Sequence, residues 1–241
     1  MTAPYFSLSQ GHLQLLSICP PQFQRRYWQQ LGSLLEPQRQ AKTEWGQNFH
    51  QLVQQWTLGL PLETLATHNL DPQEVSLLSS LKNLIATVPA LNLPPGQRQA
   101  EHQRTLARDD VLLTVVYDLL VLTPDQGKIF DWKTYPQPPK PEKLHHHWQT
   151  KLYLYVLAET SSYAPEQLSM TYWFVQSPEK IQHYTIAYNG AQHRATEREL
   201  TDLLQQFRQG VTAWQRERMP LGHRHDCQRC PYHDQFFPAD W

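Results

Sequence analysis

Apolar positions are unevenly spread along the chain, and the longest apolar stretch is residues 111–122, VLLTVVYDLLVL. Asp118 is the only charged residue within it. A short turn containing Pro124 separates this stretch from residues 128–133, KIFDWK. Runs rich in β-branched and aromatic residues on either side of a turn predict a β-hairpin. If the hairpin folds about the middle of the turn, Asp118 lies directly opposite Asp131, and the two side chains share one face of the sheet.

Outside this hairpin, the pattern predicts mainly helices. Residues 41–58 carry apolar side chains at helical spacing, with His50 at the edge of the stripe formed by Trp45, Phe49, Leu52, Val53 and Trp56. Two further helices are expected before the first hairpin, one over residues 11–35, interrupted at Pro20-Pro21, and one from Asp71 to just before Leu93-Pro94. Two more are expected after it, one over about 144–159 and one from a Thr196-x-x-Glu199 capping box to about 217. Residues 168–176 and 181–188 are expected to form a second hairpin.

The first hairpin also carries the candidate chemistry. Asp131 and Lys133 are two residues apart in one strand, so their side chains project from the same face. Carboxylates as close as Asp118 and Asp131 repel each other unless a divalent cation lies between them, and Mg²⁺ is held by carboxylates, waters and phosphate oxygens. Such a cation lowers the pKa of bound water and stabilises charge on a reacting phosphate. Burying an unpaired Asp118 in an apolar strand would be costly, which favours a functional interpretation over a simple edge-strand charge.

These residues resemble the motifs of the PD-(D/E)XK nucleases. Asp118, then Asp131-x-Lys133, then Gln149-x-x-x-Tyr153 follow the order of that family. The likeness is strongest to its RecB-like branch, which includes CRISPR-associated exonucleases and helicase-linked nuclease domains. Other segments are similar to motifs of the same branch: Gly46-x-x-x-His50, Glu101, Cys19-Pro20 with Phe23 and Tyr27, and Cys227-x-x-Cys230-Pro231. Each motif is weak alone, but seven in the expected order over residues 15–233 make the resemblance specific.

The expected fold is α/β, with a mixed central β-sheet flanked by helices. The resemblance implies a restriction-endonuclease-like core with an added helical region. A chain of 241 residues can bury its core as one domain. Within a single domain over residues 1–241, we expect a mainly helical region at 20–100, the catalytic sheet core at 101–190, and a C-terminal helix with a Cys/His tail at 191–241.

The resemblance also implies a metal site. Asp118 and Asp131 would hold Mg²⁺ or Mn²⁺, assisted by His50, by Glu101 and by the backbone carbonyl of Trp132. Oxygen ligands of this kind suit both cations.

Three further residues have implied catalytic roles. Lys133 would orient the attacking water or stabilise charge in the transition state. Gln149 and Tyr153 are four residues apart on a predicted helix, so they share one face and would position a phosphate or Lys133.

The implied activity is hydrolysis of DNA phosphodiester bonds by a metal-dependent nuclease, acting as an exonuclease or on single strands and ends. The implied context is DNA repair, with a helicase or a CRISPR-associated protein as partner. One alternative is a catalytically silent nuclease-fold subunit that binds nucleic acid or serves in assembly. A structural zinc protein is a weaker alternative.

Charge limits how such a protein can bind nucleic acid. The formal net charge of −1 excludes binding by bulk positive charge, so contacts with DNA have to be local. Arg25 and Arg26, beside Tyr27 and Trp28, are candidates for contacting phosphate while an aromatic ring stacks on a base.

Cys19, Cys227 and Cys230 are the only cysteines of the chain, one short of an all-cysteine iron–sulfur cluster. With His225 or His233 they form a candidate Cys₃His zinc site. A metal-free arrangement, with the thiols packed where the chain ends meet, is the expectation we favour. The cysteine pattern is no disulfide framework.

The sequence has no secretory leader pattern and no run of 18 apolar residues. We therefore expect a cytoplasmic protein without a membrane span.

Overall fold

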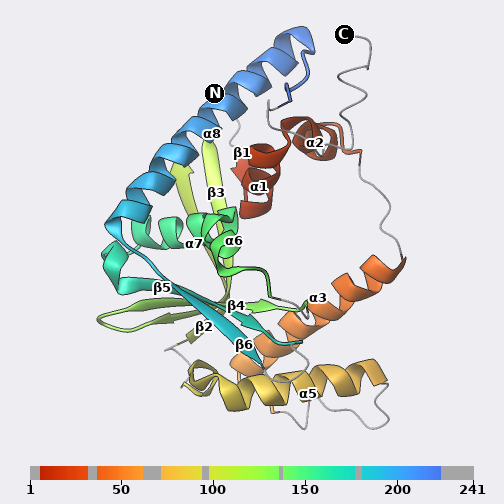
Figure 1. Cartoon of the computed structure of the whole chain (residues 1–241), viewed down its shortest axis with the longest axis vertical. Coiled ribbons are helices and arrows are strands. Elements are labelled where there is room, and N and C mark those ends of the chain that lie inside the picture. Colours follow the sequence, from red (N-terminus) through yellow and green to blue (C-terminus); the bar gives the residue numbers. More distant parts are fainter. Residues whose placement is uncertain are drawn as a thin grey trace.

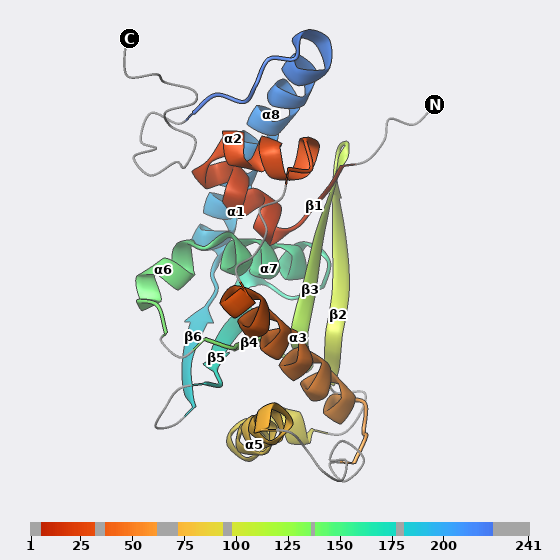
Figure 2. The ribbon, with the colours of Figure 1, turned by 90° about the vertical axis from the view of Figure 1, so that its right-hand side faces the viewer.

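The computed structural model describes residues 6–31, 37–61, 72–93, 98–135, 138–176 and 181–223. A six-stranded mixed sheet lies at its centre (Figures 1 and 2). Its strands are β1 (Phe6–Leu8), β2 (Arg98–Arg108), β3 (Val111–Leu122), β4 (Gly127–Lys133), β5 (Leu168–Phe174) and β6 (Gln182–Ala187). The expected α/β fold with a mixed central sheet flanked by helices is confirmed.

β3 is the strand around which the sheet is arranged. β2 pairs antiparallel with β3 along almost its whole length, while β1 and β4 share the other edge of β3. β5 follows β4 in parallel, and β6 pairs antiparallel with β5, as expected for the second hairpin. The predicted register of the first hairpin is confirmed in four pairs, from Leu119↔Phe130 to Leu122↔Gly127.

Helices cover the two faces of the sheet and enclose two apolar cores. The first core lies under α1 (Gln10–Ile18), α2 (Pro20–Phe23), the π-helix η1 (Gln24–Trp28), α6 (Pro141–His146), α7 (Trp148–Glu159) and α8 (Gly190–Glu217). The 3₁₀ helix η3 (Pro165–Gln167) precedes β5. The second core lies under α3 (Pro37–Thr57), α5 (Pro72–Thr87) and the 3₁₀ helix η2 (Pro89–Asn92). Figure 1 shows α3 and α5 at the end of the molecule away from α1, α2 and α8.

α7 is buried between the sheet and the other helices of its layer. Its apolar residues are distributed all round the helix, which is typical of a buried helix. Two buried polar residues, Gln149 and Thr150, interrupt this apolar surface in the first turn. Within the described residues, every helix is too short or too polar to cross a membrane.

Three differences from the expected helix boundaries have a local cause. The helix after Pro20-Pro21 ends at Trp28, and Gln30 then adopts a left-handed backbone with φ 54°. α5 ends at Thr87 because Pro89 favours an extended backbone at the residue before it.

The third difference concerns α8. The prediction that this helix starts at a Thr196-x-x-Glu199 capping box was wrong. α8 already begins at Gly190, and Thr196 is buried inside it. Asn189 is the true N-cap, and its side chain accepts the Gln192 backbone N–H at 2.9 Å.

Two strands were not predicted. β1 has only three residues, too few to show a pattern. β2 consists largely of polar residues, RQAEHQRTLAR, and lies at the edge of the sheet, so it lacks the apolar alternation of a typical strand.

Candidate active site

Three acidic residues occupy one row across the sheet. The register of the flanking pairs puts Asp118 of β3 between Glu101 of β2 and Asp131 of β4. Regular pairing is interrupted in this row. Glu101 has a left-handed backbone with φ 47°, and Asp118 Oδ2 accepts the backbone N–H of Trp132 at 2.7 Å. A side-chain carboxylate therefore takes the place of a backbone hydrogen-bond partner at this point of the sheet.

The alternation of β3 side chains reverses at Asp118. Tyr117 belongs to the core under α7, whereas Leu119 belongs to the core under α3 and α5, although a regular strand would put both on one face. Leu120 then returns to the α7 core. Because of this reversal, the row can be reached by side chains from both helical layers.

His50 enters the row from α3. Its Nδ1 lies 3.3 Å from Asp118 Oδ1 and 4.0 Å from Glu101 Oε1. Its Nε2 lies 3.0 Å from the backbone oxygen of Trp132, which orients the ring. One turn earlier, Gly46 is buried and has no side chain to hold α3 away from the end of β4.

The donor atoms of His50, Glu101 and Asp118 fit a divalent cation. They lie within 4.8 Å of one another, and they form the one such His/Cys/Asp/Glu group in the described part of the chain. Ligands at about 2.1 Å from Mg²⁺ are at most about 4 Å apart, so a small contraction would complete the set. The Trp132 carbonyl oxygen contacts Nε2, on the opposite side of the imidazole ring from Nδ1, so it does not face the same point as the donor group.

Asp131 stands outside this donor group and belongs to a second cluster. It is buried, with 2% of its surface exposed. Gln149 Nε2 donates to Asp131 Oδ1 at 2.5 Å, and Lys133 Nζ lies 2.7 Å from Oδ2. Lys133 Nζ also donates to Gln149 Oε1 at 2.8 Å, which closes a ring of three side chains. Tyr153, on the same face of α7, hydrogen-bonds to Gln149.

The acidic row controls the charge of His50. Burial acts to lower the pKa of His50, but the hydrogen bond to Asp118 and the negative charges of Asp118, Asp131 and Glu101 raise it from 6.5 to about 9. Burial and the neighbouring Asp118 charge raise the pKa of Glu101, partly offset by His50. Without a metal, the protonated imidazole therefore balances the carboxylates at neutral pH.

Lys133 keeps its charge despite being enclosed. Burial acts to lower the pKa of Lys133, but Asp131 outweighs it and the pKa is raised. Burial raises the pKa of Asp131, and Lys133 offsets this only in part. Lys133 is consequently an ammonium group at neutral pH, able to donate hydrogen bonds but not to accept a proton.

A hollow of about 610 Å³ opens beside the donor group. His50 and Glu101 form part of its wall, together with Thr134 from the segment after β4. The remaining wall comes from one side of α3: Thr43, Gly46, Gln47, Gln51 and Gln54. The site is therefore open to a ligand approaching along α3.

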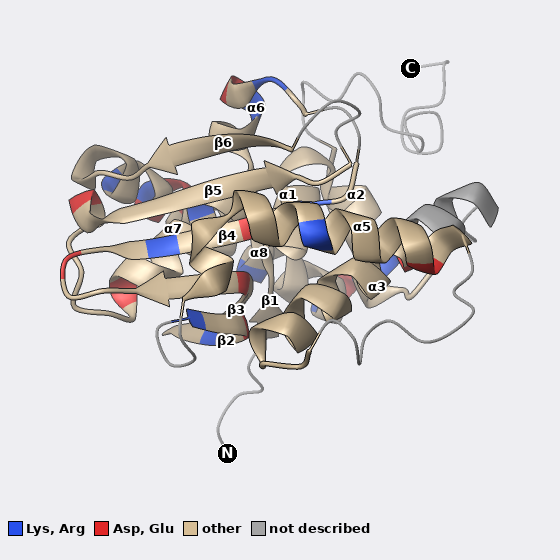
Figure 3. Cartoon of the chain, turned by 90° about the horizontal axis from the view of Figure 1, so that it is seen from below, with Lys and Arg blue, Asp and Glu red and all other residues tan. Residues whose placement is uncertain are grey.

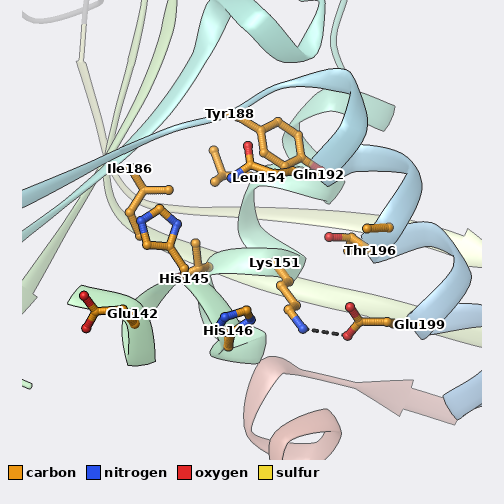
Figure 4. A pocket seen from close by; sticks show the side chains of 12 residues that line it. Glu142, His145, His146, Lys151, Leu154, Ile186, Tyr188, Gln192, Thr196 and Glu199 are labelled. Carbon is orange, nitrogen blue, oxygen red and sulfur yellow. Dashed lines mark hydrogen bonds and ion pairs between the residues drawn. The ribbon is translucent and has the colours of Figure 1, made fainter. Parts of the chain in front are cut away.

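A separate cavity of about 360 Å³ lies on the other side of α7 (Figure 4). Its wall includes Leu154 and Ile186, and an ion pair of 2.6 Å joins Lys151 to Glu199 at its side. It shares no lining residue with the hollow beside His50. A ligand would therefore reach the acidic row through the hollow along α3, and not through this cavity.

Some predicted residues lie elsewhere. Arg25 and Arg26 belong to η1 and do not line the hollow beside His50. Cys19 is buried at the junction of α1 and α2. The other members of the predicted terminal metal site, Cys227, Cys230, His225 and His233, lie outside the described residues.

Sequence reasoning missed the residues that surround the donor group. Thr134 and the three α3 glutamines Gln47, Gln51 and Gln54 were not singled out. Their signal was present in the helical spacing of the glutamines, on a side of α3 next to the apolar stripe.

Comparison with known proteins gives a family match over most of the chain. The model of the PD-(D/E)XK nuclease superfamily matches residues 7–235. No curated protein matches the chain.

Solved structures show a similar fold. A "putative exonuclease" from Eubacterium rectale superposes with a TM-score of 0.52 at 11% sequence identity, covering 83% of this chain and 80% of that protein. The superposition with the protein SSO0001 covers 85% of this chain and 78% of that protein at 10% sequence identity. Its TM-score of 0.38 is too low to indicate a common fold. At such identities the likeness to the first structure concerns the fold alone.

Proposed function

The chain belongs to the PD-(D/E)XK nuclease superfamily, and on that premise we propose that it is a divalent-metal-dependent deoxyribonuclease. Its substrates would be single strands or ends of DNA. The observation that carries the proposal is the convergence of His50, Glu101 and Asp118 within 4.8 Å, next to the buried cluster of Asp131, Lys133 and Gln149.

His50, Glu101 and Asp118 would hold Mg²⁺ or Mn²⁺, with Asp131 of the same row as a further carboxylate ligand. Bound there, the cation would lower the pKa of water and neutralise charge on the phosphate. His50 has to lose its extra proton to become a ligand. Its Nε2–H would keep donating to Trp132, which directs Nδ1 toward the carboxylates.

Lys133 would act on the phosphate as a fixed positive charge. Its ammonium group can donate to a non-bridging oxygen, where negative charge increases as the bond to the leaving group breaks. Because it is already protonated, it would not serve as the base that activates water.

Gln149 and Tyr153 would hold the catalytic cluster in place. Gln149 contacts both Asp131 and Lys133, so its amide sets the distance between the carboxylate and the ammonium group. Tyr153 in turn orients Gln149. Such supporting hydrogen bonds reduce the motion of groups that must meet the reacting atoms precisely.

Two observations support action on strand ends. The likeness in fold to a "putative exonuclease" is compatible with it. The hollow along α3 also leads directly to His50 and Glu101, so an unpaired strand could approach the donor group from one side.

The test is cleavage of end-labelled single-stranded and double-stranded DNA with Mg²⁺, Mn²⁺ or EDTA. Wild type should give metal-dependent products that disappear in Asp131→Ala, and shortening from one end would identify an exonuclease. A folded, metal-binding wild type that cleaves neither DNA would contradict the proposal. An RNA strand of the same sequence, cleaved in preference to DNA, would contradict the choice of substrate.

A further inference from the structure

One side of α3 carries a stripe of uncharged amides. Gln47, Gln51 and Gln54 are spaced by four and three residues, so they lie above one another on the helix. All three line the hollow that His50 and Glu101 also line. In Figure 2, α3 crosses in front of the sheet beside β3. This arrangement places the amide stripe directly beside the donor group.

The hollow is unsuited to binding phosphates by charge. Its lining contains no Lys or Arg among the described residues, and its charged members are Glu101 and His50. Figure 3 shows few coloured segments along α3, in keeping with a helix in which Glu44 is the only Asp, Glu, Lys or Arg from 43 to 57. Binding through phosphates needs Lys or Arg to replace the counterions of the nucleic acid. A strand in this hollow must therefore be held by other contacts.

The three amides are available for such contacts. Within the described part of the chain, no hydrogen bond is made by the side chain of Gln47, Gln51 or Gln54. Gln47 and Gln51 are exposed, and Gln54 is half-buried. Each amide offers one acceptor oxygen and two N–H donors, the same mixture that the edges of nucleobases present.

We propose that the amide stripe of Gln47, Gln51 and Gln54 binds the bases of a single nucleic-acid strand next to the bond that is cleaved. The inference rests on the proposed function, because that function places the scissile phosphate at the donor group. The Watson–Crick edges of the bases are free for such hydrogen bonds in an unpaired strand and are occupied in a duplex.

The stripe has the length of a short stretch of strand. From Gln47 to Gln54 the helix rises about 10 Å, which corresponds to about three nucleotides stacked at about 3.4 Å. Gln51 also lines an additional hollow of about 250 Å³ between α3 and α5, together with Asn48 and Gln55. The amide surface therefore continues beyond the donor group.

The experiment compares two triple variants. Gln47→Ala/Gln51→Ala/Gln54→Ala removes the stripe, and Gln205→Ala/Gln206→Ala/Gln209→Ala removes three exposed glutamines of α8 as a matched control. Each is made with and without Lys133→Met, which prevents cleavage during binding measurements. Binding of a short fluorescein-labelled single strand is followed by fluorescence anisotropy in Mg²⁺, and circular dichroism verifies folding.

The stripe variant should raise Kd by about tenfold or more, the loss expected for one or two base hydrogen-bond pairs. The control should bind like the parent protein. An oligonucleotide with abasic sites should bind equally to the parent and the stripe variant. Affinity of the parent should fall by less than about tenfold between 50 and 200 mM salt, since few phosphates are neutralised.

An unchanged Kd in the stripe variant would overturn the proposal, as would an equal loss with the abasic strand or a steep salt dependence. Absence of binding by the parent protein would also overturn it and would point to a protein partner for α3. Cleavage is scored separately with Lys133 intact. If wild type cleaves DNA and the stripe variant keeps the same KM, the inference fails while the proposed function stands. If the strand binds through the stripe but is never cleaved, the function fails instead.

Discussion

Gly46 of α3 lies so close to Thr134 that a Cβ at position 46 would be only 2.8 Å from Thr134 Oγ1. Contacts that short do not occur without movement. The next nearest atom, Thr134 Cβ, would be at 3.7 Å, an ordinary contact distance. The absence of a side chain at position 46 therefore lets α3 approach the end of β4 and brings His50, one turn later, to Asp118. This gives the Gly-x-x-x-His spacing a physical reason.

Gly46→Ala should lower cleavage by about tenfold or more, because a displacement of α3 moves His50 away from Asp118. Stability should change little, since alanine favours a helix over glycine by about 1 kcal/mol and offsets part of the strain. Adding Thr134→Ala removes the oxygen that the new methyl group meets, so the double variant should recover activity. Thr134→Ala alone provides the control, and a double variant as inactive as Gly46→Ala would contradict this explanation. Cleavage rates and thermal unfolding give the two readouts.

Gln149→Ala should reduce both activity and stability. It leaves Asp131 buried with one partner fewer, at a cost of about 1–3 kcal/mol in the free energy of unfolding. It also frees Lys133 from the amide that positions it, so kcat should fall by about tenfold or more. Gln149→Glu is the informative comparison, because it keeps the size of the side chain but adds a negative charge beside Asp131. A Gln149→Ala enzyme with wild-type kcat would show that Asp131 and Lys133 hold their positions without it.

Lys133→Met should abolish measurable cleavage while the protein still folds and binds metal. Methionine keeps an apolar stem near Tyr172, whose ring lies 5.2 Å from Lys133 Nζ, but it removes the charge. Asp131 retains the hydrogen bond from Gln149 and can take up a proton, since burial already raises its pKa. Calorimetric titration with Mn²⁺ and circular dichroism would verify metal binding and folding. Wild-type cleavage by this variant would exclude a catalytic role for Lys133.

The stability of the metal-free protein should fall as the pH rises past neutrality. Folding raises the pKa of His50 from 6.5 to about 9. The resulting stabilisation is therefore fully present below pH 6.5 and is lost as the pH rises through about 9. It amounts to at most about 3.5 kcal/mol, at about 1.4 kcal/mol for each tenfold change in proton affinity. Urea unfolding in EDTA at pH 6 and pH 10, with wild type beside His50→Gln, measures this effect. Parallel pH dependence in the two proteins would show that His50 is not its source.

Local patterns in the sequence were enough to predict the first hairpin. The apolar run ending at Leu122, the turn and the short strand before Thr134 lie next to one another in the chain, and the turn sets their register. The apolar stripe of α3 was equally readable, and Phe49 and Val53 are buried as it indicated. The metal-binding chemistry proposed for Asp118 and Asp131 followed from their types and spacing, together with the likeness to a known family.

The sequence alone determined that carboxylates, a lysine and a histidine are carried by a hairpin and an amphipathic helix; only the tertiary structure decided which of them meet. Glu101 reaches Asp118 because the polar strand β2 pairs with β3, and its sequence gives no apolar alternation that would predict a strand. His50 meets Trp132, 82 residues away, because α3 packs over the second core. The side chains of β3 also change face at Asp118, where Tyr117 and Leu119 enter different cores. These features depend on packing between distant segments, which the periodicity of any one segment does not encode.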